Sequence, residues 1–285
     1  MRNDTIGTKA LIEVKNLSFA YEDKMVINNI NLSIASNEKI AVVGPNGAGK
    51  STFFLNLNGV LQPDGGEIYL FGKKIGKKDF LELRKKVGFV FQDADSQLIA
   101  SNVKAEISFG PVNLGLSRDE VIKRVDETIE YMSLSNLQER APHYLSGGEK
   151  KSVSIADILA MEPELFIFDE PMAALDPVNA EKVERILEKL HQDGKTLLIA
   201  THDVEFAYRF ADRILVFADG SLIADGTPNQ IFKSPEILRQ AHLKKPFALA
   251  VWEALIAGQI VTNEDDYPLT PEEIVSRITY SLTET

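Results

Sequence analysis

The chain has 285 residues, of which 44% are hydrophobic and 26% are charged, so it can form one large domain with an appendage or two small domains. It contains no cysteine, which excludes disulfides, thiolate metal sites and cysteine nucleophiles. The net charge of −11 argues against a broad nucleic-acid interface, because such interfaces need a basic face.

Neither end of the sequence carries a membrane signal. Residues Met1–Thr5 lead into no apolar core, so we expect no signal peptide. The best candidate for a membrane span, Phe247–Ala257, is too short to cross a bilayer and contains Glu253. If the protein works at a membrane, we expect it to bind there through a partner.

The N-terminal part predicts β-structure that leads into a glycine-rich loop. Apolar residues alternate along residues 11–34, which predicts two or three strands. The apolar run Lys39–Val43 predicts a buried strand, and residues 52–57 can open a helix. Between them, residues 44–52 are Gly-Pro-Asn-Gly-Ala-Gly-Lys-Ser-Thr. This order of strand, loop and helix is the context that a phosphate-binding loop requires.

The loop itself fills the pattern G-x-x-x-x-G-K-[ST]. Its glycines allow backbone N–H groups to surround phosphate oxygens, and the helix N-terminus adds its positive dipole end. Lys50 is expected to reach the β- and γ-phosphates, and the Ser51 hydroxyl to hold Mg²⁺. A glycine-rich turn without a ligand is the alternative, which the presence of both side chains disfavours. The residues expected to bind the triphosphate are Gly44, Pro45, Asn46, Gly47, Ala48, Gly49, Lys50, Ser51 and Thr52.

The rest of the chain alternates predicted strands and predicted helices. Strands are expected at residues 67–71, 87–91, 165–168, 195–200 and 212–217, and helices at 147–158, 177–192 and 235–257. Capping-box patterns at Ser117 and Thr270 predict two more helix starts, and an acidic loop is expected at 263–266. This order indicates an α/β fold with a parallel core and an N-terminal antiparallel β layer. We expect a helical subdomain at about 97–160 and a C-terminal helical extension at 237–285.

Two carboxylates follow the apolar strand predicted at 165–168. Asp169 at such a strand end can hold Mg²⁺ opposite the phosphate loop. Glu170 beside it can activate water against the γ-phosphate. A solvated strand end is the alternative, but the glycine-rich loop elsewhere in the chain favours the catalytic interpretation.

A second glycine motif, Leu-Ser-Gly-Gly-Glu-Lys, occupies residues 145–150. Ser146 is a natural N-cap, and Gly147 and Gly148 leave backbone N–H groups accessible at a helix start. The motif therefore predicts a second anion site, separate from the first. An ordinary capped helix after a turn is the alternative.

With both motifs present, the chain resembles the nucleotide-binding subunit of an ATP-binding cassette (ABC) transporter, over residues of about 10–236. The resemblance implies a P-loop NTPase (RecA-like) core and a nucleotide-binding domain at 1–236. In this family residues 145–149 are the signature loop, which closes over ATP held by another subunit. It therefore implies a head-to-tail dimer with two ATP molecules and Mg²⁺ at the interface. ATP links the two subunits, and hydrolysis releases them.

Four further positions match the family by their place in the chain. Gln92 matches the Q-loop glutamine, which senses Mg²⁺ and the attacking water, and Asp176 matches the D-loop at the dimer interface. His202 matches the switch histidine that contacts the γ-phosphate, and Tyr21 matches the aromatic residue that stacks on adenine. Without the resemblance, Gln92 is a surface amide, His202 a structural histidine and Tyr21 a β-surface aromatic.

Residues 91–98 and 109–116 resemble the energy-coupling-factor and cobalt/nickel branch of importer ATPases. In that branch two ATPase subunits bind a transmembrane coupling protein and a membrane substrate-binding protein. The resemblance implies a peripheral protein at the cytoplasmic face of the cell membrane, with residues 93–116 as the membrane-partner contact and no nucleic-acid partner. The alternative is that 93–116 is the stem of the helical lobe.

Three residues depart from the family pattern. Glu149 replaces the more usual Gln, Ser152 a basic residue, and Asp157 a small residue, and these changes affect the expected turnover rate. A soluble ABC ATPase acting on nucleic acid or ribosomes, and a nucleotide-gated module that does not hydrolyse ATP, remain alternatives. The sequence leaves open the cargo (cobalt, nickel or a vitamin), the choice between homodimer and heterodimer, and the role of residues 237–285.

Overall fold

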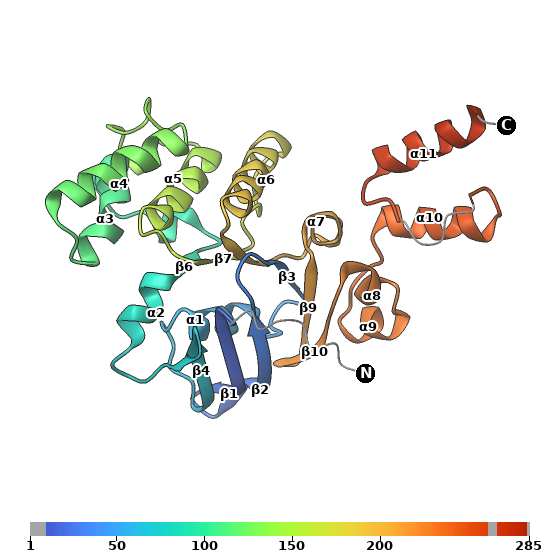
Figure 1. Ribbon diagram of the computed structural model, residues 1–285, viewed down its shortest axis with the longest axis horizontal. Coiled ribbons are helices and arrows are strands. Elements are labelled where there is room, and N and C mark those ends of the chain that lie inside the picture. Colours follow the sequence, from blue (N-terminus) through green and yellow to red (C-terminus); the bar gives the residue numbers. More distant parts are fainter. Residues whose placement is uncertain (1–9, 262–266, 284–285) are drawn as a thin grey trace.

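The computed structural model describes residues 10–261 and 267–283 of the chain. The predicted acidic loop at 263–266 and residues Met1–Thr5 lie outside the described residues. Figure 1 shows a central sheet with an antiparallel sheet below it, a helical lobe at the upper left and the C-terminal helices at the right. The predicted α/β fold is confirmed.

The central sheet has six strands in the order β10-β9-β3-β8-β7-β6. Five of them are parallel, and β10 is an antiparallel edge strand. Because the parallel strands end at the same edge, the loops after β3, β6, β7 and β8 meet there. The strands are β3 (Lys39–Val43), β6 (Val87–Val90), β7 (Leu165–Asp169), β8 (Thr196–Ala200), β9 (Arg213–Ala218) and β10 (Ser221–Gly226).

The second sheet is antiparallel, with four strands in the order β2-β1-β4-β5. Its two longest strands, β1 and β2, alternate between buried and exposed residues, as a sheet with one solvated face requires. The two strands observed over residues 11–34 agree with the prediction. The strands are β1 (Ile12–Tyr21), β2 (Lys24–Ile34), β4 (Gly65–Leu70) and β5 (Lys73–Lys74).

Side-chain alternation along the central strands creates two covered faces. Leu165 and Ile167 of β7 pack in one core with the antiparallel sheet and helix α1, whereas Phe166 and Phe168 pack in a second core with the helical lobe. The helices of this part are α1 (Lys50–Leu57), α2 (Phe80–Lys86), α3 (Val103–Asn113), α4 (Arg118–Tyr131), α5 (Gly147–Leu159), α6 (Pro177–Gln192) and α7 (Val204–Phe210), with short 3₁₀ turns at Ala94–Ser96 and Pro142–Tyr144.

The C-terminal helices pack on the β3 and β9 side of the same sheet, where Trp252 and Ile274 share a core with Ala41 and Val216. The prediction of one helix over 235–257 is wrong in its middle. The chain breaks between two helices, where His242 has a positive φ of 52° and Pro246 precedes the next helix. The helices are α8 (Pro228–Phe232), α9 (Pro235–Gln240), α10 (Phe247–Ala257) and α11 (Pro271–Thr283). No helix in the described part of the chain is long and apolar enough to cross a bilayer.

The predicted capping box at Ser117 forms only by half. The Ser117 hydroxyl accepts a hydrogen bond from the Glu120 N–H at 3.3 Å, as predicted. The Glu120 carboxylate, however, pairs with Arg124 at 2.8 Å instead of returning to the helix start. At Ser146, by contrast, both bonds of the box are present.

Candidate nucleotide site

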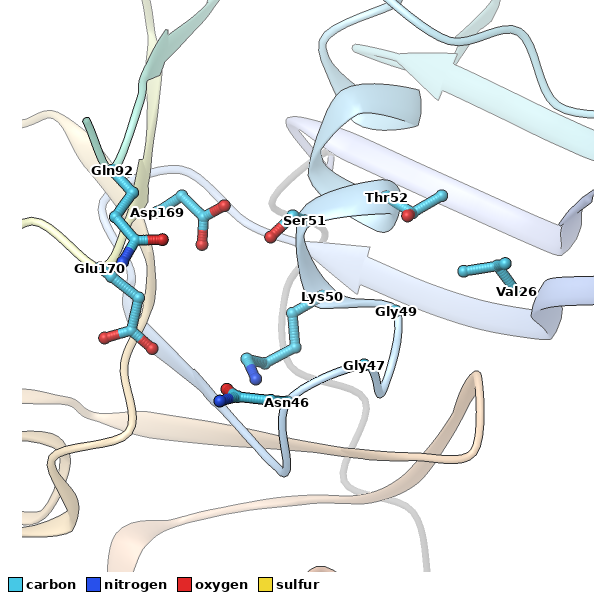
Figure 2. A pocket seen from close by; sticks show the side chains of 10 residues that line it. All are labelled: Val26, Asn46, Gly47, Gly49, Lys50, Ser51, Thr52, Gln92, Asp169 and Glu170. Atoms are coloured by element: carbon cyan, nitrogen blue, oxygen red, sulfur yellow. The ribbon is translucent and has the colours of Figure 1, made fainter. Parts of the chain in front are cut away.

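The glycine-rich loop joins β3 to α1 and forms one wall of a pocket. Helix α1 starts after Gly49, which has a φ of 97° and no side chain to cap the helix. The free N–H groups at this start therefore remain available for an anion. The pocket is lined by Val26, Asn46, Gly47, Gly49, Lys50, Ser51, Thr52, Gln92, Asp169 and Glu170 (Figure 2).

Two glycines of the loop are required by close backbone contacts. A Cβ atom at Gly44, which has a φ of 143°, would lie 2.1 Å from the carbonyl oxygen of Phe217. A Cβ atom at Gly49 would lie 2.8 Å from the carbonyl oxygen of Val26. The loop is thus held between β9 and β2, and any side chain at these two positions would force its backbone to move.

Lys50 is buried and folds back over the loop. Its Nζ donates hydrogen bonds to the carbonyl oxygens of Gly44 at 2.8 Å and Pro45 at 3.1 Å. Burial lowers the pKa of Lys50, while the carboxylates of Glu170 and Asp169 oppose that decrease. The ammonium group therefore lies between the loop and the acidic side of the pocket.

The acidic wall of the pocket comes from the ends of β6 and β7. Figure 2 shows Gln92, Asp169 and Glu170 facing Lys50 and Ser51 across the pocket. The alignment of the parallel strands brings these residues together, although Gln92 and Asp169 are far apart in the sequence. The predicted grouping of Lys50, Ser51, Gln92, Asp169 and Glu170 in one pocket agrees with this geometry.

Glu170 has an unusual backbone and a defined side-chain partner. Its φ of 47° is rare for a residue with a Cβ, and such conformations concentrate at functional sites. One carboxylate oxygen lies 2.7 Å from Nδ1 of His202 and also accepts a hydrogen bond from the His202 N–H at 3.3 Å. His202 is largely exposed and lies outside the lining of the pocket, which it reaches through its contact with Glu170.

The donors in the pocket fit Mg²⁺. Mg²⁺ prefers hard oxygen ligands and is usually held by one or two side chains together with substrate phosphates and water. The hydroxyl of Ser51, the carboxylate of Asp169 and the amide of Gln92 supply such oxygens on opposite walls. In the described residues no cluster of three or more His, Cys, Asp or Glu side chains could hold a metal without phosphate ligands.

The signature motif lies outside this pocket. Ser146 is the N-cap of α5, where its side chain accepts the Glu149 N–H and its own N–H donates to Glu149 at 2.8 Å. Gly148 packs so closely against the start of α6 that a Cβ atom there would lie 2.1 Å from Oδ1 of Asn179. Ser146, Gly147 and Gly148 line no part of the pocket that contains Lys50.

Asp176 and Tyr21 also lie outside the lining of the pocket. Asp176 caps α6 by accepting the N–H groups of Val178 and Asn179, both at 3.0 Å. Tyr21 is 47% exposed at the end of β1 and packs edge-on against Phe19. Its exposed ring is available for stacking outside the pocket.

Val26 and Gly220 are site residues that sequence reasoning missed. Val26 lines the pocket from β2, and its carbonyl oxygen approaches both Gly49 and Gly220. The Gly220 N–H donates to the carbonyl oxygen of Ala48 at 3.2 Å, which ties the β9–β10 turn to the phosphate loop. The Asp-Gly pair at 219–220 predicts a hairpin turn, but nothing in it indicates contact with this loop.

The chain is similar in sequence to a known protein family and to several named proteins. The family model described as ABC transporter matches residues 27–173. The energy-coupling factor transporter ATP-binding protein EcfA of Methanothermobacter thermautotrophicus is 44% identical over 275 residues, covering 95% of this chain and 88% of the relative. EcfA of Methanocaldococcus jannaschii is 43% identical, covering 91% of this chain and 92% of the relative.

Solved structures show the same similarity. CbiO1 of Clostridium perfringens, part of the ABC transporter complex CbiONQ, has a TM-score of 0.73 and 36% identity over 87% of this chain and 99% of its own. The ATP-binding cassette MJ0796, solved as a post-hydrolysis dimer with ADP and Pi, has a TM-score of 0.67 and 30% identity over 76% of this chain and 98% of its own. The chain belongs to the ABC transporter family of ATP-binding proteins.

Proposed function

We propose that the chain is the ATP-hydrolysing subunit of an importer of the energy-coupling-factor or cobalt/nickel type. The observation that carries the proposal is the pocket in which the phosphate loop faces Gln92, Asp169 and Glu170. The similarity over nearly the whole chain to proteins named as energy-coupling-factor ATP-binding subunits supports the subtype. ABC ATPases that act on nucleic acid or ribosomes are disfavoured by the same relatives and by the net charge of −11.

In the proposed mechanism, the phosphate loop and the start of α1 bind the triphosphate. The N–H groups that follow Gly49 point at the phosphates, and Lys50 leaves its carbonyl partners to contact the β- and γ-phosphates. Mg²⁺, held by Ser51 and Asp169, would neutralise charge on the phosphate oxygens. Tyr21 extends the site toward the adenine ring.

Glu170 is the proposed general base. Its carboxylate accepts a proton from the water that attacks the γ-phosphate, and Gln92 orients that water from the neighbouring strand end. His202 holds the carboxylate at 2.7 Å. In the proposed mechanism it exchanges this contact for one to the γ-phosphate. The products are ADP and inorganic phosphate.

The second glycine motif completes the site of another subunit. Ser146, Gly147 and Gly148 lie away from the pocket of their own chain, so a phosphate can reach them only from outside it. We infer a head-to-tail dimer in which this motif closes over ATP bound to the partner, with Asp176 at the interface. One chain carries both halves of a composite site, so a homodimer would contain two complete sites.

The membrane partner is proposed to bind the segment at 93–116. Ile99, Phe109 and Val112 give this segment exposed apolar side chains that a partner could cover. The loop and α3 form one unit, because Glu106 accepts the N–H groups of Ile99 and Ala100 at 2.8 and 2.6 Å. A coupling protein that docks here would place the chain peripherally at the cytoplasmic face of the membrane, and a separate membrane component would bind the metal ion or vitamin.

Affinity purification of the tagged chain from detergent-solubilised membranes tests the proposal. We expect a polytopic membrane protein to co-purify with the wild-type chain and with Val275→Asp, which changes a valine on α11 that is 64% exposed, against 57% for Val112. Val112→Asp should lose it, because a charge in an apolar interface is costly to desolvate. Recovery of no membrane protein, or equal recovery with both variants, would contradict the importer assignment or the location of its contact.

A further inference from the structure

Lys151 on α5 is a buried cation outside the nucleotide pocket. Only 2% of the residue is exposed, and its Nζ donates hydrogen bonds to the carbonyl oxygens of Phe91 at 2.8 Å and Gln92 at 2.7 Å. No carboxylate in the described part of the chain lies within ion-pair distance of this ammonium group. The carbonyl dipoles at the end of β6 are therefore its direct partners.

A charge in this position is costly for folding. Burial lowers the pKa of Lys151 to about 8, while the more distant charges of Asp93 and Asp169 oppose the shift. The two hydrogen bonds offset part of this cost, and an apolar side chain would leave both carbonyl oxygens without this donor. The ammonium group lies at the end of β6 and binds the main chain of a residue that lines the nucleotide pocket, and this geometry points to a role in that pocket.

Lys151 holds the main chain of a residue whose side chain enters the nucleotide pocket. Gln92 lines that pocket with Asp169 and Glu170, and its own carbonyl oxygen is one of the two partners of Lys151. Gln97 makes a second connection of the same kind, because it accepts the Phe91 N–H at 3.3 Å and donates to the Ser154 carbonyl at 2.8 Å. Residues 91–97 are thus fixed to α5 by Lys151 and Gln97, and the ion pair of Lys150 with Asp95 at 2.6 Å adds a further contact.

The neighbouring residue cannot make this connection. Ser152, where the family pattern usually has a basic residue, is fully buried, and its hydroxyl donates to the Gly148 carbonyl within the same helix. Lys151 consequently supplies the basic side chain that links the start of α5 to the end of β6.

We propose that Lys151 is a positioning residue for ATP hydrolysis. It fixes Gln92 in the nucleotide pocket and couples it to α5, the helix that begins with the second glycine motif. The inference rests on the role proposed above for Gln92. Lys151 itself contacts no substrate atom. It acts by limiting the orientations that the Gln92 backbone can adopt, so that the side-chain amide stays within reach of the attacking water.

A double-mutant cycle on the full-length chain tests the inference. We compare Lys151→Met, Gln92→Ala and the double variant, and measure kcat, the Kd for Mg-ATP and the Tm. Lys151→Met should lower kcat by about tenfold or more, in the range reported for misplaced catalytic groups, and change the Kd by less than about twofold. In the Gln92→Ala background it should change kcat by less than about twofold, because the two residues act as one unit.

Stability separates positioning from packing. The Tm of Lys151→Met should decrease by no more than a few degrees, because removal of a buried charge offsets part of the loss of two hydrogen bonds. Lys123→Met, the same chemical change on an exposed part of α4, is the matched control and should leave all three quantities unchanged. If the methionine variant does not fold, Lys151→Gln replaces it, with the same expected decrease in kcat because the shorter amide cannot reach both carbonyls.

Three results would overturn the inference. The first is a normal kcat for Lys151→Met, and the second is additive effects in the cycle. The third is a large decrease in Tm together with weaker ATP binding, which would indicate that Lys151 contributes only to packing. If Gln92→Ala itself has normal kcat, the proposed role of Gln92 is wrong and the inference fails with it, whereas a defect confined to Gln92→Ala contradicts only the role of Lys151.

Discussion

Two helix starts in this chain follow glycine motifs, yet they satisfy their backbone donors differently. Helix α1 starts after Gly49, which has no side chain to cap it. Helix α5 starts after Ser146, whose hydroxyl accepts the Glu149 N–H while Glu149 returns to the Ser146 N–H. The first start is open to a phosphate, and the second is already occupied by its own side chains.

This difference explains why the start of α1 can bind a phosphate without a second subunit, whereas the start of α5 cannot. At α1, the buried Lys50 provides positive charge beside the free N–H groups. At α5, hydrogen bonds from the Ser146 N–H and then the Ser146 hydroxyl lower the pKa of Glu149, so a carboxylate stays charged where a phosphate would dock. We infer that α5 accepts a phosphate only when another subunit presents one already neutralised by its own site.

The largest expected effect concerns the acidic wall opposite α1. Glu170→Gln should lower kcat for ATP hydrolysis by about 10²–10⁴-fold, because the variant lacks a base for the attacking water. The Kd for ATP should change little, since the phosphates are bound at α1. A phosphate-release assay with Glu130→Gln, an exposed change on α4, as the control measures this effect, and near-normal turnover would remove Glu170 from the mechanism.

Lys50→Ala should break the open site itself. We expect ATP binding to weaken and hydrolysis to decrease by about 10²–10³-fold, the typical loss on removal of one charge-stabilising donor. Titration calorimetry and the release assay measure the two effects. Lys78→Ala, in an exposed turn, serves as the matched control, and ATP binding of equal strength in both variants would contradict the phosphate contact.

Glu149→Gln should make α5 more similar to α1. Glutamine can still accept the Ser146 N–H and preserve the cap, while it removes a negative charge beside the incoming phosphate. The ATP concentration for half-maximal dimerisation should decrease by about threefold, a modest factor because the side chain is partly exposed. An increase in that concentration would show that the carboxylate aids closure.

Farther along α5, Asp157 should make stability depend on pH. Burial raises its pKa to about 7, while its unfolded value is 3.8, so the folded state holds the extra proton between these values. The stability that this group contributes is complete below pH 3.8 and is lost as the pH rises through 7. Asp157→Asn should therefore raise the Tm by several degrees at pH 8 and by less at pH 5.

Thermal unfolding of the wild type and Asp157→Asn at both pH values gives the comparison. Asp23→Asn, an exposed change, should shift the Tm little at either pH. A Tm shift of Asp157→Asn that is equal at pH 5 and pH 8 would contradict the raised pKa. That result would indicate that the hydrogen bond from Gln97, at 3.1 Å, keeps the Asp157 carboxylate charged in the folded state.

The sequence predicted those parts of the fold that local patterns encode. Apolar runs identified the buried strands β3, β7 and β8, and the phosphate-loop pattern located Lys50 and Ser51 in the pocket. The register of the parallel strands, which the sequence does not encode locally, brings Gln92 beside Asp169. Only the order of family motifs made that grouping predictable.

The missed features depend on contacts between distant segments. Glu106 has the pattern of an ordinary helical residue, but it is buried and binds the backbone of the preceding loop. Val26 and Gly220 approach the phosphate loop through backbone atoms. Such contacts do not constrain the residue type, except where only glycine fits. Nothing in the sequence distinguishes Lys151 from a surface lysine, whereas the structure shows it buried against the end of β6.

The measurement that tests the account most directly is the mass of Glu170→Gln in solution, by light scattering, with Mg-ATP and with Mg-ADP. We predict twice the mass of one chain with Mg-ATP and a single chain with Mg-ADP, because only ATP presents a γ-phosphate to the partner's Ser146 and Gly148. Ser146→Arg in the same background should remain a single chain with either nucleotide. The same mass for Glu170→Gln with Mg-ATP and with Mg-ADP would contradict the composite site.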